Sequence, residues 1–247
     1  MTSDTDLGSA RRRSAPNAGK GGRRALRILL PVVLAAGLGL SLAGCKTSEE
    51  QANDYYQSGL DLLAQGDKDR ALVQFRNVFN IDGTHYDARR KLAEVMLESG
   101  NAREAYSQYL RLAEQYPDDL STRVALSRIA FDQSQAEEFR RHVTRAVEIA
   151  PDDPEVKVLD LAQRYADASR SDDGAARGPL AQEAEVLAQT RPDDPMLLSI
   201  LLDRAAQDKQ LDVADRITAR LIELQPDRYQ RYQQRLALLL EKGDMAG

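Results

Sequence analysis

The sequence repeats with a period of 34 residues, and this period constrains the possible fold more than any other feature. When residue 52 is taken as position 1, glycine returns at position 15, alanine at 20, an aromatic ring at 24 and proline at 32. These recurring residues are Gly66 and Gly100, Ala71 and Ala105, Phe75 and Tyr109, and Pro117 and Pro151. A unit of this length cannot bury an apolar face alone. The period therefore predicts stacked repeats that share a continuous core.

Within each repeat the apolar residues follow the spacing of two amphipathic helices. Gly66-Asp67 pairs a helix-terminating residue with a helix N-cap. Asp153 precedes Pro154, which places an N-cap acid ahead of a proline in the first helical turn. The pattern predicts an all-α solenoid of five helix pairs and a final helix over 229–242.

This pattern resembles the tetratricopeptide repeat, which has a large residue at position 4, a small residue at 8, alanine at 20, an aromatic at 24 and proline at 32. The first repeat matches it with Tyr55, Gly59, Leu62, Ala71, Phe75 and Val78. The resemblance places repeats at 52–85, 86–119, 120–153, 154–194 and 195–228. The fourth repeat matches least well, because Pro151 and Pro192 are 41 residues apart instead of 34.

Charge separates the N-terminal segment from the rest of the chain. The sequence holds 34 basic and 39 acidic residues. Residues 1–44 contain seven of the basic and two of the acidic ones, which leaves 27 basic and 37 acidic residues in 45–247. An apolar run from Ile28 to Gly44 follows the early arginines and spans 17 residues, whereas a spanning helix needs about 20. A basic stretch followed by a short apolar run is typical of a signal peptide.

The apolar run ends in Leu42-Ala43-Gly44-Cys45, which resembles the lipobox of bacterial lipoprotein signal peptides. The resemblance implies cleavage before Cys45 and lipid attachment to Cys45. We therefore predict a signal peptide at 1–44, a lipidated tether at 45–51 and the solenoid domain at 52–247. A plain N-terminal membrane anchor, with Cys45 incidental, is the alternative.

The residue after the lipobox bears on location. In lipoproteins of this kind an aspartate after the lipidated cysteine often retains the protein in the inner membrane, and this chain has Lys46 there. The resemblance therefore favours attachment to the outer membrane, facing the periplasm. In an organism with one membrane, the protein would sit on the outer face of that membrane.

Composition excludes several functional classes. One cysteine cannot form an internal disulfide, and the two histidines, His85 and His142, are too far apart for a local metal motif. The net charge of −5 argues against nucleic-acid partners. No phosphate-binding loop or catalytic motif occurs. We expect no cofactor, no metal and no enzymatic activity, and we expect both histidines at the surface.

The resemblance also implies a concave binding groove lined by the first helix of each repeat. Carried over to this sequence, the groove positions are Tyr56, Arg90, Glu94, Arg128, Phe131, Tyr165, Asp203 and Gln233. Alternatively, the aromatic members only pack between repeats. Chaperone-binding members have Lys and Asn at positions 5 and 9 of the first repeat. Tyr56 and Leu60 stand there in this chain, which argues against that partner class.

These features together favour a lipid-anchored scaffold that docks protein partners during assembly of a cell-envelope machine. That machine could be a pilus or secretion channel, outer-membrane proteins or exopolysaccharide export. The second hypothesis is a regulator or adaptor of cell-wall enzymes. The final helix either caps the solenoid, with Arg231, Gln234 and Arg235 solvating its outer face, or is followed by further repeats in a longer protein.

Overall fold

The computed structural model describes residues 46–171 and 174–243. The predicted signal peptide and the lipidation site Cys45 lie outside these residues. The chain divides into two units, Met1–Glu50 and Gln51–Gly247, and the second holds the repeats. Across the described ranges the structure contains eleven α-helices and no strand, which confirms the predicted all-α solenoid. None of these helices combines the length and apolar character needed to cross a membrane.

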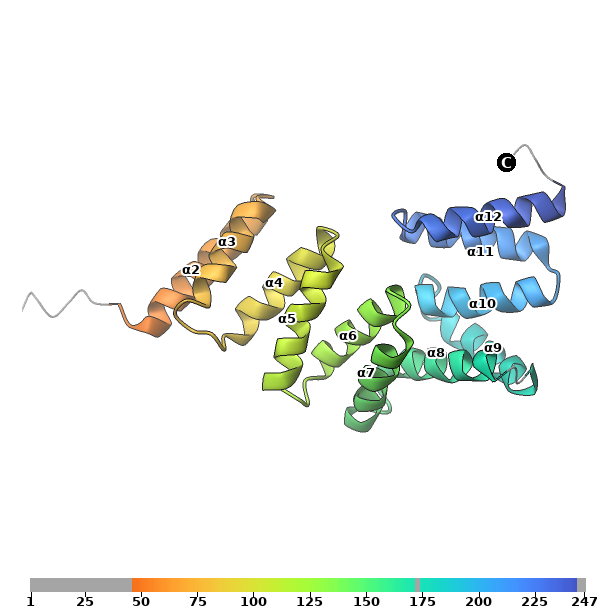
Figure 1. Ribbon diagram of the computed structural model, residues 1–247, viewed down its shortest axis with the longest axis horizontal. Coiled ribbons are helices and arrows are strands. Elements are labelled where there is room, and N and C mark those ends of the chain that lie inside the picture. Colours follow the sequence, from red (N-terminus) through yellow and green to blue (C-terminus); the bar gives the residue numbers. More distant parts are fainter. Residues whose placement is uncertain (1–45, 172–173, 244–247) are drawn as a thin grey trace, which may run out of the picture. The chain divides into compact units, whose positions relative to one another are not determined.

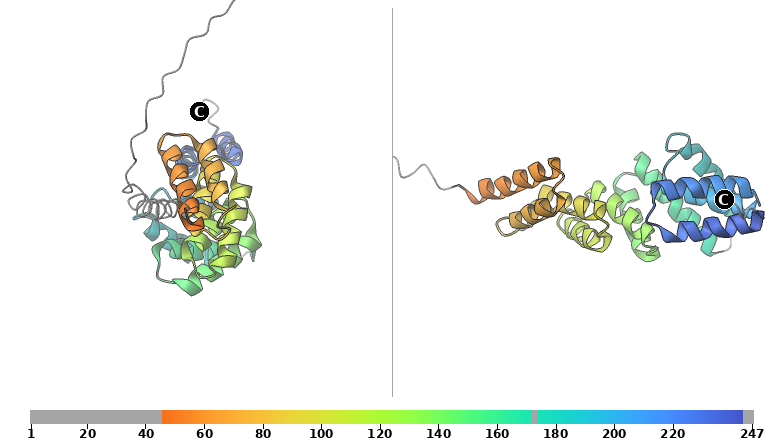
Figure 2. Two further views of the ribbon diagram at one scale, coloured as in Figure 1. Left: turned by 90° about the vertical axis from the view of Figure 1, so that its left-hand side faces the viewer. Right: turned by 90° about the horizontal axis from the view of Figure 1, so that it is seen from above.

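The helices follow one another in pairs (Figure 1; two further directions in Figure 2). They are α2 (Ser48–Ala64), α3 (Lys68–Val78), α4 (Tyr86–Glu98), α5 (Ala102–Gln115), α6 (Leu120–Asp132), α7 (Ala136–Ile149), α8 (Pro154–Arg170), α9 (Gly174–Ala188), α10 (Pro195–Gln207), α11 (Leu211–Leu224) and α12 (Tyr229–Lys242).

The first helix begins inside the segment predicted as a tether. Thr47 Oγ1 accepts a hydrogen bond from the backbone N–H of Glu50 at 3.1 Å, and the backbone N–H of Thr47 donates to Glu50 Oε2 at 2.8 Å. This reciprocal pair is a capping box, which fixes a helix N-terminus. Helix α2 therefore starts at Ser48, four residues before the predicted boundary at residue 52.

The first repeat brings its two helices together through a small residue. In the first repeat Gly59 of α2 faces Phe75 of α3, and both are buried. A Cβ atom on Gly59 would lie 2.5 Å from the nearest atom of the Phe75 ring. The small residue at position 8 and the aromatic residue at position 24 therefore pack against each other in this repeat.

The turn between the paired helices has the same backbone conformation in four repeats and after α12. Its residue at position 15 has a positive φ: Gly66 at 78°, Gly100 at 79°, Ser134 at 56°, Lys209 at 57° and Gly243 at 73°. Glycine adopts this conformation without strain, whereas other residues lose about 1–2 kcal/mol there. The end of the helix can therefore be predicted from the sequence where the residue is glycine. It cannot be predicted in this way at Ser134 and Lys209.

The junctions between repeats are held by capping acids. Asp153 Oδ1 accepts from the N–H of Glu155 at 2.8 Å, and Asp194 Oδ1 accepts from the N–H of Met196 at 2.9 Å. The N-cap at Asp153 was predicted from the Asp153-Pro154 pair, and Asp194 precedes Pro195 in the same way. These bonds fix where α8 and α10 begin.

Arginines at position 4 support two junctions as well. The guanidinium of Arg89 donates to the carbonyl of Gly83 at 2.5 Å, and that of Arg123 donates to the carbonyl of Pro117 at 3.1 Å. In both cases the acceptor lies six residues earlier, in the loop that enters the repeat. A large cationic residue at this position therefore ties down the loop before its own helix.

Part of the extra length of the fourth repeat lies in its first helix. Helix α8 has 17 residues and continues to Arg170, whereas α6 and α10 have 13 residues each. The polar residues that disturb the sequence pattern pair with each other: Arg164 donates to Asp160 at 2.8 Å and to Glu183 of α9 at 2.8 Å. Asp160 and Arg164 therefore form part of the contact between α8 and α9.

His142 is buried, so the expected surface position is wrong. Its side chain is 1% exposed and lies on the face of α7 that also carries Phe139, Val143 and Ala146. The neighbouring Arg140 and Arg141 concealed this apolar face in the sequence. His85 was also expected at the surface, but it is only partly exposed. It caps α4, accepting from the N–H of Ala88 at 3.2 Å.

The buried imidazole belongs to a short hydrogen-bond chain. Arg123 Nη1 lies 3.5 Å from His142 Nδ1, His142 Nε2 lies 3.0 Å from the Tyr106 hydroxyl, and that hydroxyl donates to Glu138 at 2.9 Å. A neutral imidazole protonated on Nε2 satisfies all three contacts. Burial, with the nearby charges of Arg141 and Arg123, lowers the pKa of His142 to about 4, and Glu138 opposes this shift.

We expect Gly59→Ala to destabilise the protein by about 1–3 kcal/mol, because the added methyl group overlaps the Phe75 ring. Alanine is otherwise favoured over glycine in a helix by about 1 kcal/mol, so the sign of the effect is diagnostic. Urea unfolding measures it. In a Phe75→Leu background the same substitution should cost at least about 1 kcal/mol less. An equal cost in both backgrounds would contradict the packing described.

We expect His142→Gln to reduce the acid sensitivity of the fold. The neutral imidazole contributes stability that is complete above the unfolded pKa of about 6.5 and is lost as pH falls toward the folded pKa of about 4. Between these values the wild type should lose up to about 3 kcal/mol more than the variant. Urea unfolding at several pH values measures the difference. Parallel stability curves for the two proteins would show that His142 is not the responsible group.

Candidate functional site

The predicted groove residues of the first two repeats are engaged in packing and local ion pairs. The Tyr56 ring lies 5.9 Å from Phe75 and 5.3 Å from His85, measured between ring centroids. Arg90 and Glu94 of α4 pair with each other at 3.5 Å, and Lys91 reaches Glu94 at 2.5 Å. Tyr56 therefore fills the space between repeats, and the charges on α4 are balanced within that helix.

Arg128 links three inner helices, which are α6, α8 and α10, the first helices of the last three repeats. From α6 it pairs with Glu155 in the first turn of α8 and with Asp194, the N-cap of α10, at 2.8 Å. Asp194 is buried, and Arg191 pairs with Glu155 as well. These contacts accompany direct packing of α6 on α8 and of α8 on α10. Arg128 was predicted as a groove residue, and here it holds this part of the solenoid together.

Tyr165 and Asp203 form a pair between α8 and α10. The Tyr165 hydroxyl donates to Asp203 Oδ2 at 2.5 Å, and Gln207 donates to the same oxygen at 2.7 Å. The Tyr165 side chain is buried, and burial together with the hydrogen bond to Asp203 raises the pKa of its hydroxyl. Gln233 is exposed on α12 and lines neither of the two cavities described next.

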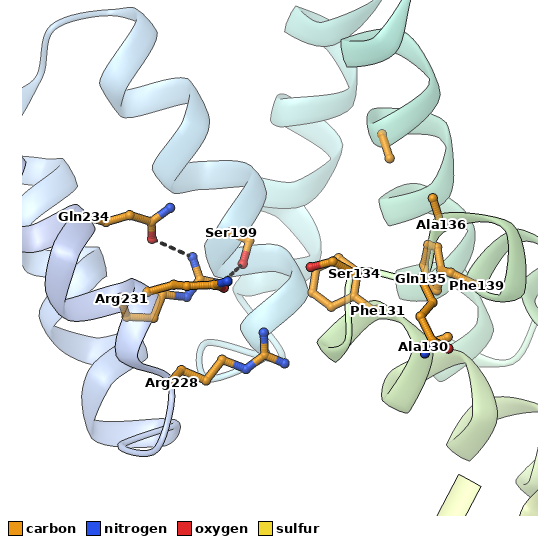
Figure 3. A pocket seen from close by; sticks show the side chains of 12 residues that line it. Ala130, Phe131, Ser134, Gln135, Ala136, Phe139, Ser199, Arg228, Arg231 and Gln234 are labelled. Carbon is orange, nitrogen blue, oxygen red and sulfur yellow. Dashed lines mark hydrogen bonds between the residues drawn. The ribbon is translucent and has the colours of Figure 1, made fainter. Parts of the chain in front are cut away.

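A cavity of about 380 Å³ lies where the turn between α6 and α7 faces α10 and α12 (Figure 3). Aromatic rings and alanines form much of its wall, and arginines, glutamines and serines from several elements complete it. The lining residues are Ala130, Phe131, Ser134, Gln135, Ala136, Phe139, Ala166, Ser199, Arg228, Gln230, Arg231 and Gln234. Phe131 is the predicted groove residue that reaches this cavity, and its ring lies 5.5 Å from that of Phe139.

A second cavity of about 440 Å³ lies between α10 and α12. It shares Ser199, Arg231 and Gln234 with the first cavity, so these three side chains stand at the border of both. The remaining lining residues are Leu202, Asp203, Ala206, Ala237, Leu238 and Glu241. Asp203 is therefore the second predicted groove residue that lines a cavity.

Arg231 is the cation at this border, and its hydrogen-bond partners are neutral. Its guanidinium donates to Ser199 Oγ at 2.8 Å and to the Gln234 side-chain oxygen at 3.1 Å, as drawn in Figure 3. Burial and the nearby charge of Arg228 lower the pKa of Arg231, and Asp132 opposes this. The interpretation of Arg231 as a residue that solvates the outer face of α12 is wrong, because it faces the cavities. Arg235, one turn further along, pairs with Asp215 of α11 at 2.9 Å.

Asp132 neutralises Arg228, which lines the first cavity. It lies at the end of α6 and pairs with Arg228, and the Gln225 side chain donates to it at 3.4 Å. Burial raises the pKa of Asp132, and the charge of Arg228 counteracts this. The third repeat therefore touches the segment before α12, although the two are 93 residues apart at Gln225.

Sequence reasoning missed Arg228 and the turn at 133–136 because the carried-over positions come only from the first helix of each repeat. It missed Gln234 because the family pattern places Gln233, the preceding residue of α12, in the groove. A weak signal existed in the clustering of Arg228, Arg231 and Gln234 near the start of the last helix. No cluster of His, Cys, Asp or Glu side chains in the described part of the chain could hold a metal ion.

Comparison with known proteins identifies the repeats. Residues 62–121, from α2 to the start of α6, match the tetratricopeptide repeat family. A tetratricopeptide repeat protein from Parabacteroides merdae has a similar structure, with a TM-score of 0.52 and 13% identity over 78% of this chain and 74% of that one. A double mutant of MamA RS-1 matches with a TM-score of 0.51 and 12% identity over 73% of this chain and 97% of that one. The C-terminal part of a tetratricopeptide repeat-containing protein from Cytophaga hutchinsonii matches with a TM-score of 0.50 and 13% identity. The match covers 74% of this chain and 72% of that one.

Residues 62–121 therefore match the tetratricopeptide repeat family, and the described helices as a whole have the fold of a tetratricopeptide-repeat solenoid. No curated protein matches its sequence. The fold is typical of non-catalytic scaffolds that bind other proteins, and it presents binding surfaces on stacked helices.

Proposed function

We propose that this protein is a lipid-anchored scaffold of the bacterial cell envelope that docks protein partners during assembly of an envelope machine. The observation that carries the docking role is the pair of neighbouring cavities that share Arg231 in their walls. Both fall within the range of about 300–1,000 Å³ that is common for ligand pockets. Aromatic and arginine side chains together are frequent anchors at protein interfaces.

The lipobox-like sequence Leu42-Ala43-Gly44-Cys45 supports the envelope location. Lipid on Cys45 would attach the chain to a membrane, and two or more acyl chains give stable attachment. Helix α2 begins at Ser48, so the extended link after Cys45 is at most about 10 Å long. Lys46 supports outer-membrane sorting, with the repeats in the periplasm. The machine would be a pilus or secretion channel, outer-membrane proteins or exopolysaccharide export.

Cys45→Ala should abolish metabolic labelling with palmitate and release the protein from membranes, because the thiol is the proposed lipid acceptor. Labelling and fractionation of envelopes measure both effects. Lys46→Asp is the matched variant: it should keep the label and shift the protein to the inner membrane. Unchanged labelling of Cys45→Ala would overturn the lipoprotein proposal.

Site-specific crosslinking tests the docking role. A photoreactive amino acid in place of Gln234, which borders both cavities, should trap partners in intact envelopes. The same group in place of Val186, exposed on α9 and outside both cavities, is the control. Mass spectrometry should identify envelope-assembly components among the products specific to position 234. Cell-wall enzymes there would favour an adaptor role instead, and identical products at both positions would contradict the proposed docking site.

A further inference from the structure

We infer that the two neighbouring cavities, which share Ser199, Arg231 and Gln234, bind a partner segment in which an internal acidic side chain is flanked on both sides by large apolar side chains, with the acid at Arg231. The inference rests on the proposed docking function and specifies the chemistry of the partner. Three features of the site carry it: the pairing state of Arg231, the apolar walls on its two sides, and the acids at the far ends of the site.

The three arginines around the start of α12 differ in their partners. Arg228 pairs with Asp132 and Arg235 pairs with Asp215, whereas the Arg231 guanidinium, among residues 46–171 and 174–243, donates to the neutral oxygens of Ser199 and Gln234 and to no carboxylate. A partly buried cation is costly unless an anion compensates it. Two of the five N–H groups of Arg231 are used within the described residues, which leaves donors in a planar fork that fits a carboxylate. A ligand carboxylate would supply the missing charge.

Apolar surface lies on both sides of this guanidinium. In the first cavity it comes from Ala130, Phe131 and Phe139, and in the second from Leu202 and Leu238. Each cavity is large enough to accept a large side chain. Burial of such side chains would supply affinity, and the charge at the centre would fix the register of the segment.

The position of Arg231 at the shared border indicates an internal acid. A segment that fills both cavities must continue past Arg231 in both directions, so the carboxylate belongs to a side chain. A terminal carboxylate placed at Arg231 would leave one cavity empty.

Acids beyond the centre limit the pattern to one carboxylate. Asp203 and Glu241 line the second cavity, and Asp132 lies beside the first, where it neutralises Arg228. A further acid in the flanks would meet these carboxylates and be repelled. We therefore expect uncharged, apolar flanks.

Capped synthetic peptides test this directly. Acetylated and amidated peptides carry a central Glu with Phe or Leu on both sides at several spacings, and their binding to the purified full chain in lipid nanodiscs is measured by fluorescence anisotropy. Replacing the central Glu with Gln should weaken the best binder about tenfold or more, because a charge-assisted contact is lost. Replacing either apolar flank with Ser should also weaken it, and a peptide that ends at the Glu should bind less well.

Protein variants assign the effect to one residue. Arg231→Gln should abolish the preference for Glu over Gln, whereas Arg235→Gln, on the same helix but outside the cavities, should keep it. Thermal unfolding checks that both variants are folded, and if Arg231→Gln is not, the peptide series on the wild type decides. Equal binding of Glu and Gln peptides, undiminished binding of the peptide ending at Glu, or no binding up to about 1 mM would overturn the inference. Crosslinking at position 234 would still stand as a separate test of docking.

Discussion

The ion bridges of Arg128 hold together the part of the solenoid on which the site depends. One guanidinium on α6 contacts both the first turn of α8 and the N-cap of α10. Elsewhere in a repeat array each unit contacts only its neighbours. Here three inner helices are drawn together, and the turn after α6 consequently reaches the segment before α12. Without this convergence, Phe131 and Arg231 would not face the same cavity.

The burial of Asp194, together with the partial burial of Arg128 and Glu155, makes this bridge sensitive to the loss of either side. Asp194 is buried and also caps α10, so it serves the helix and the bridge at once. Removing one partner of a buried charge pair leaves an uncompensated charge, which is more costly than never having formed the pair. The Arg128 position therefore suits a structural role, and the cation available to a ligand is Arg231. From the sequence, Arg128 was predicted to line the binding groove and Arg231 to solvate the outer face of the last helix. In the structure Arg128 joins helices and Arg231 lines the cavities.

The sequence predicted most of the helices because local patterns determine them. The 34-residue period, the Gly66 stop and the Asp153 cap all act within a few residues of the chain. The site was harder to predict from the sequence. The contact between Asp132 and Arg228 depends on the small rotation of each repeat relative to the one before it, and these rotations add up over several repeats. The prediction for His142 was wrong for a different reason. The adjacent arginines suggested an exposed position, whereas the helical period places His142 on the same face as Phe139, Val143 and Ala146. Phe131 and Asp203 were found because the family pattern places them on inner helices.

The proposed anchor precedes the first repeat in the chain, whereas the proposed binding site is formed from the third repeat onward. Two residues separate Cys45 from the start of α2, and the cavities involve α6, α7, α8, α10 and α12. Because repeats transmit interactions mainly to their neighbours, substitutions near Cys45 should leave Arg231 and its surroundings unchanged. The capping box supports this separation. Its two hydrogen bonds join Thr47 and Glu50, so the start of α2 is fixed without any contact to the proposed lipid. Attachment and recognition can therefore be altered independently in one chain, which is the property a tethered scaffold needs.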